Sequence, residues 1–69
     1  MIWADWRYNE EIGQWETIVH CKSSEEAKDL AKKLRTRKYG VIVKDNKIIV
    51  NQYIPVYRLE KILGIEVEY

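Results

Sequence analysis

The chain has little of what small proteins use to reinforce a limited core. Its 69 residues include one cysteine and one histidine, so neither an internal disulfide nor a structural zinc site can form. Phenylalanine is absent, and the aromatic residues are three tryptophans and five tyrosines. Stability must therefore come from packing or from a partner, and large rings with polar tips suit the edge of a small core.

Long apolar runs and targeting segments are also missing. No stretch approaches the roughly 20 apolar residues of a membrane span, and the start MIWADW has neither the basic residues nor the apolar run of a signal peptide. A chain this short cannot divide its core between two domains. We therefore expect a single domain over residues 1–69, in the reducing cytoplasm, with no membrane partner.

The residues that are present predict a folded chain, with 46 per cent hydrophobic and 33 per cent charged residues. Residues 1–9 and 14–21 are alternating or β-branched and flank a polar stretch, which predicts a hairpin with a longer loop. Ser23 and Glu26 match a capping box ahead of apolar residues at helical spacing. This pattern predicts a helix over about residues 24–36.

The second half of the chain repeats the order of two strands and a helix. VIVKDNKIIV, residues 41–50, predicts a second hairpin, because Asp45-Asn46 can take the positive φ angles of a tight turn. Pro55 and Gly64 bracket a short helix, and residues 65–69 alternate as a terminal strand would. The prediction is an α+β fold, ββαββα(β), with a mainly antiparallel sheet and two helices on one face.

One stretch resembles part of a known arrangement. SSEEAKDLAKKLRTRKYGVIV, residues 23–43, is a capped helix that leads through a basic turn into an apolar strand. It resembles half of a SPOR-type or ferredoxin-like βαβ arrangement. No second matching half follows, so the resemblance assigns no family.

Alternation along each strand predicts which sheet face it buries. The inward residues are Ile2, Ala4, Trp6, Tyr8, Trp15, Thr17, Val19, Cys21, Val41, Val43, Ile48 and Val50. Because two helices can cover only one face, the other should be open. Its apolar residues are Trp3, Ile18, Ile42 and Ile49, set among Asp5, Arg7, Glu16, His20, Lys44 and Asn51.

An exposed apolar patch with a polar rim is typical of an interaction site, and a large aromatic residue is a typical anchor. Trp3, Ile18, Ile42 and Ile49 are therefore the candidate protein-binding residues. Two other interpretations stay open. Isolated surface hydrophobic residues need no partner, and a one-residue shift in one strand would reverse its faces.

The charge is nearly balanced overall, at +1, but it is unevenly spread. Residues 20–47 carry a net charge of +5, whereas residues 1–19 carry −3 and residues 48–69 carry −1. We define the basic strip as Lys28, Lys32, Arg35, Arg37 and Lys38, which follow the first helix and the turn after it.

The basic strip has three interpretations. It could contact nucleic-acid phosphates, and the binding would then weaken steeply with salt. It could face an acidic protein. Alternatively, it only offsets the helix dipole, on a helix laced with ion pairs such as Asp29 with Lys33.

The parts of a catalytic centre are absent from the sequence. There is no glycine-rich phosphate loop and no HExxH or GxSxG motif. His20 and Cys21 are adjacent on a strand, so their side chains should point to opposite faces and cannot form a nucleophilic pair. We expect no enzyme activity, no catalytic residue, no cofactor and no metal.

Together these patterns predict a small non-enzymatic binding protein, such as an inhibitor, adaptor or regulator. It would bind a protein partner through the open sheet face or self-associate as a homo-oligomer. The alternative is a nucleic-acid-binding module that uses the basic strip.

Overall fold

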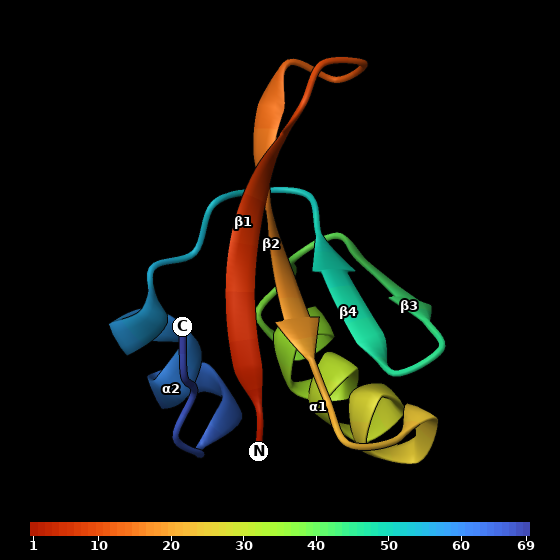
Figure 1. Ribbon diagram of the computed structural model, residues 1–69, viewed down its shortest axis with the longest axis vertical. Coiled ribbons are helices and arrows are strands. Elements are labelled where there is room, and N and C mark those ends of the chain that lie inside the picture. The colour runs from red at the N-terminus through yellow and green to blue at the C-terminus, as the bar shows by residue number, and fades with distance from the viewer.

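The computed structural model describes all residues 1–69, and the chain folds in the order ββαββα (Figure 1). The elements are β1 (Trp3–Asn9), β2 (Gln14–His20), α1 (Ser24–Thr36), β3 (Val41–Lys44), β4 (Lys47–Val50) and α2 (Val56–Leu63). The predicted α+β class and element order are confirmed. Neither helix is long and apolar enough to cross a membrane.

The four strands form one sheet in the order β1-β2-β4-β3, and every neighbouring pair is antiparallel. β2 and β3 consequently run in the same direction with β4 between them, and α1 connects them. This is a split βαβ unit of the kind found in ferredoxin-like folds.

The core lies between the sheet and both helices. Alternate strand residues, among them Ala4, Val19 and Ile48, pack in one buried cluster with side chains from both helices. The helical members are Ala27, Leu30, Ala31 and Leu34 of α1 and Leu59, Ile62 and Leu63 of α2. Both helices therefore cover the same face of the sheet, and the other face has no covering element.

Local sequence signals set the helix ends. The Ser23 hydroxyl accepts a hydrogen bond from the Glu26 backbone N–H at 3.1 Å, as the capping pattern predicts. The Glu26 carboxylate accepts from the Lys22 backbone N–H at 2.8 Å instead of the Ser23 N–H of a reciprocal capping box. At the end of α2, Gly64 has a φ of 70°, the left-handed conformation in which glycine is favoured.

The turn of the second hairpin is tied to the end of β2. Asp45 takes a positive φ of 57°. Asn46 accepts the Cys21 backbone N–H with its carbonyl and donates from its side-chain amide to the Cys21 carbonyl, both at 2.8 Å. The two hairpins are joined at this point as well as along the β2–β4 ladder.

A buried hydroxyl holds the connection from β4 to α2. Thr17, in the middle of β2, is fully buried and donates to the Gln52 carbonyl at 2.8 Å. The same hydroxyl accepts from the Ile54 backbone N–H at 2.8 Å, and the Trp6 indole donates to the Ile54 carbonyl at 2.9 Å. These three bonds, which we call the Thr17 clamp, fix the position of the residues before α2.

Two inward assignments at the far end of the first hairpin are wrong. Tyr8 and Trp15 are each about half exposed, although they share the strand face of Trp6 and Thr17. Figure 1 shows why: the hairpin extends well beyond the second hairpin, and both helices lie near its other end. Tyr8 and Trp15 instead pack edge to face on each other, with ring centroids 5.8 Å apart.

The expected terminal strand is reduced to a single contact. Residues 65–69 make one parallel bridge to β1, between Trp3 and Glu68. Backbone bonds from Ala4 to the Glu68 carbonyl at 2.7 Å and from Glu68 to the Ile2 carbonyl at 2.9 Å form it. The predicted alternation holds at Val67, which is buried between two exposed glutamates.

Replacing Thr17 with valine tests the clamp. Thr17→Val keeps the shape but leaves the buried Ile54 N–H without its acceptor, and we expect a loss of about 2 kcal/mol in the free energy of unfolding. Urea denaturation measures it. Thr17→Ser, which keeps the hydroxyl and removes a methyl, should lose only about 1 kcal/mol. Equal losses in the two variants would show that packing, and not the hydrogen bonds, matters here.

Candidate functional site

The open face is organised in rows that follow the strand register. One row runs across all four strands as Asp5, Ile18, Ile49 and Ile42. The adjacent row runs as Trp3, His20, Lys47 and Lys44. We call them the isoleucine row and the cation row. Side chains directly opposite in register are close neighbours, so each row is contiguous.

The β1 and β2 part of the open face is held by internal pairs. Glu16 is buried and accepts from Arg7 Nε and from Asn9 Nδ2, both at 3.2 Å. His20 Nε2 is hydrogen-bonded to Asp5 Oδ1 at 2.9 Å, and its ring stacks on Trp3 with centroids 3.7 Å apart. The polar groups of these hydrogen-bonded side chains therefore already have partners within the face.

The β3 and β4 part of the face is different, because Lys44 and Lys47 are exposed and neither is in an ion pair. They pair directly across the strands, which places two like charges side by side. A depression of about 320 Å³ lies between the rows, with Ile18 and Ile49 among its lining residues. Its cationic lining residues outnumber the single carboxylate of Asp5.

All four predicted protein-binding residues lie on the open face, but their exposure differs. Ile42 is 65% exposed and Trp3 is 41% exposed, whereas Ile49 is half-buried. Ile18 is only 8% exposed, so its predicted role as an exposed anchor is wrong. It lies on the central strand β2, between Asp5 of β1 and Ile49 of β4 in the register.

The basic strip is exposed along its whole length, since Lys28, Lys32, Arg35, Arg37 and Lys38 are all solvent-accessible. None of the five is in an ion pair. The expected pair between Asp29 and Lys33 is absent, because the Lys33 ammonium donates to the Leu63 carbonyl at the end of α2, 2.9 Å away. The interpretation of α1 as a helix laced with ion pairs is therefore wrong.

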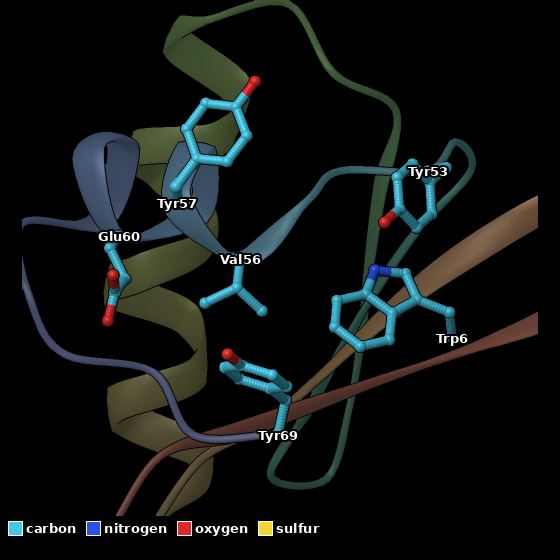
Figure 2. A pocket seen from close by; sticks show the side chains of 6 residues that line it. All are labelled: Trp6, Tyr53, Val56, Tyr57, Glu60 and Tyr69. Carbon is cyan, nitrogen blue, oxygen red and sulfur yellow. The ribbon is translucent and has the colours of Figure 1, made fainter.

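A second surface was not foreseen from the sequence. A groove of about 610 Å³ lies between β1 and α2 on the side of the sheet that carries the helices, and Figure 2 shows its side chains. The residues lining it, which we call the aromatic groove, are Trp6, Tyr53, Val56, Tyr57, Glu60 and Tyr69. Trp6 and Tyr53 form one wall, with ring centroids 5.8 Å apart.

The sequence contained only a weak signal for the aromatic groove. Tyr53 and Tyr57 lie four residues apart on either side of Pro55, a spacing that alone indicates no site. Trp6 and Tyr69 come from the two ends of the chain, and only the tertiary fold brings them together. Trp6, which strand alternation predicts to face the core, packs against the core but is only partly buried.

Cys21 and His20, the remaining reactive side chains, do not lie together. Cys21 is buried on the helix side of the sheet, while His20 lies on the open face. Burial, with a contribution from the Glu26 charge, raises the pKa of the Cys21 thiol from 9.0 to about 11. No group of three or more potential metal-ligating side chains is present.

Comparison with known proteins finds no matching family profile, no matching curated protein and no matching solved structure.

The raised pKa of Cys21 predicts slow alkylation of the folded protein. At pH 8 the shift lowers the thiolate fraction by about 100-fold, so iodoacetamide should label native protein at least about 100-fold more slowly than urea-unfolded protein. Because the folded-state pKa is the higher one, the neutral thiol's contribution to stability is complete below pH 9 and is lost as pH rises toward about 11. A Ser24→Cys, Cys21→Ala variant supplies an exposed thiol as control. Equal labelling rates for the folded wild type and the folded variant would contradict the burial of Cys21.

Proposed function

We propose that this protein is a non-enzymatic binding protein whose open sheet face docks an acidic protein partner. Apolar side chains of the partner would pack on the isoleucine row, and its carboxylates would face Lys44 and Lys47. The observation that carries the proposal is an apolar row beside two unpaired lysines, on a sheet face that neither helix covers. We place this activity in the cytoplasm, where a lone reduced cysteine is usual.

The β3 end of the face has the features of a binding anchor. Ile42 is largely exposed on an edge strand, and the half-buried Ile49 lies directly beside it. Burying an isoleucine side chain contributes about 1.5 to 3 kcal/mol. Lysines at the rim add specificity and speed association more than they add affinity.

Charge favours an acidic partner over a second copy of the chain. Arg7 and His20 already have carboxylate partners on the face, which leaves the positive charges of Lys44 and Lys47 uncompensated. Two copies packed face to face would bring four such lysines together, and like charges in a desolvated interface cost several kcal/mol. We therefore expect the isolated protein to be monomeric in sedimentation experiments.

The experiment begins with a photo-crosslinking amino acid at position 42, used in cells that express the protein to identify the partner. The purified partner is then titrated by calorimetry. Ile42→Asp should weaken binding by at least about tenfold, because it places a charge in the apolar contact. Lys44→Glu with Lys47→Glu should weaken it by about tenfold and remove most of its salt dependence.

The matched control is Lys22→Glu with Lys61→Glu, which makes the same charge change at exposed lysines outside the open face. Its affinity should stay within about twofold of wild type. The proposal fails if the open-face variants and the control bind equally well. It also fails if the partner's contact surface carries no acidic residues.

The basic strip supports a second candidate function, contact with nucleic-acid phosphates. The specific observation is that all five cations are exposed and none has a carboxylate partner. Three to five phosphate contacts would make binding strongly dependent on salt.

This second function predicts saturable binding of oligonucleotides at about 50 mM salt that weakens by orders of magnitude at about 200 mM. Tryptophan fluorescence measures it with single- and double-stranded probes. Arg35→Glu with Arg37→Glu should lower the affinity and flatten the salt dependence, and Lys22→Glu with Lys61→Glu should change both less. A flat response at both salt concentrations would reject nucleic-acid binding.

A further inference from the structure

We propose that the aromatic groove binds a basic peptide segment, with a lysine or arginine side chain of that segment lying against its rings. The groove is on the helix side of β1, so this inference concerns a different surface from the open sheet face and does not depend on it.

Apart from the contact between Trp6 and Tyr53, the rings are arranged around an open space. Figure 2 shows Trp6 and Tyr53 on one side, Tyr57 and Glu60 of α2 on the other, Tyr69 below them and Val56 between. The three tyrosines are exposed. Cations are attracted to the faces of such rings, and most strongly to tryptophan.

Acidic residues continue the groove at its α2 end. A neighbouring depression shares Glu60 and Tyr69 with the groove and is also lined by Glu66 and Glu68. None of the three glutamates is in an ion pair. One cation of a peptide could therefore lie over the rings while a second cation, one or two residues further along, lies beside the glutamates.

Two residues of the groove, Trp6 and Glu60, are fixed by hydrogen bonds before any ligand arrives. The Trp6 indole is fixed by its bond to the Ile54 carbonyl, which belongs to the Thr17 clamp. Glu60 Oε2 accepts from the Val67 backbone N–H at 3.0 Å, which joins α2 to the segment that carries Tyr69. Preformed walls reduce the ordering cost of binding.

One cation lies near the groove without lining it. Arg58 is beside Tyr39 and Tyr57. A side-chain hydrogen bond with Tyr39 and the charge of Tyr57 raise the pKa of its guanidinium, which is charged at neutral pH in any case. The lining itself contains one carboxylate and no cation. Charge therefore favours a basic occupant over an acidic or purely apolar one.

The probe is the peptide acetyl-Ala-Arg-Ala-Lys-Ala-Arg-Ala-amide. Its matched neutral analogue has citrulline in place of arginine and norleucine in place of lysine. Both are titrated into ¹⁵N-labelled full-length protein, and the amide and indole resonances are followed by NMR. We expect the basic peptide to shift the Trp6 indole signal and the amides of residues 53–54, 56–60 and 66–69, and the neutral analogue to shift none.

Variants at exposed positions test the two contributions separately. Tyr53→Ala with Tyr57→Ala should weaken binding by at least about tenfold through lost cation–π contact. Glu60→Gln keeps an oxygen acceptor for the Val67 N–H and should weaken binding by about threefold. The controls are Tyr8→Ala and Glu10→Gln, an exposed ring and an exposed carboxylate on the far part of the first hairpin, and both should bind like wild type.

Several results would overturn the inference. Equal binding of the neutral analogue would show that charge does not select the occupant of the groove. Absence of shifts with either peptide at about 50 mM salt would reject a peptide site. Shifts confined to the open face would also reject it.

Ile42→Asp should bind the basic peptide like wild type, because Ile42 does not line the aromatic groove. The groove and the open-face function can therefore fail independently. Concentration-dependent association that Tyr53→Ala with Tyr57→Ala abolishes would instead assign the groove to the basic strip of a second copy.

Discussion

The two hydrogen bonds of the Thr17 hydroxyl are the interactions on which the placement of α2 against the sheet most depends. The hydroxyl accepts one backbone hydrogen bond and donates another to the short connection between β4 and α2. The Trp6 indole completes the clamp at the Ile54 carbonyl. Because an unpaired buried polar group is costly, the connection has one favoured path, and α2 is placed beside β1. The aromatic groove is the space that this placement leaves.

The same placement gives the molecule two unlike surfaces. Both helices pack on one side of a sheet of four strands, so the opposite side keeps its apolar row and its free Lys44 and Lys47. The helix side carries the rings of the aromatic groove and the carboxylate of Glu60, which is in no ion pair. The two proposed binding surfaces therefore differ in charge, with free lysines on the open face and a carboxylate in the groove.

Local patterns in the sequence were sufficient for the elements, because they act over a few residues. Ser23 caps α1, Asp45 turns the second hairpin and Gly64 ends α2, each by a bond or a backbone angle within its own segment. Patterns that depend on distant neighbours were less reliable. Lys33 bonds the Leu63 carbonyl instead of Asp29, because an exposed ion pair within a helix contributes only a few tenths of a kcal/mol and a fixed carbonyl was within reach.

The sequence by itself determined the α+β class, the element order and the side of each strand that faces the core, since periodicity and turn chemistry are local properties. Tertiary structure alone decided how much of each strand the helices cover. That is why Tyr8 and Trp15 are exposed beyond the core. Ile18 is buried for another reason, since it lies on the central strand β2 with a neighbouring strand on each side. It also decided the meeting of Trp6 with Tyr69, because only the packed core brings the two ends of the chain together.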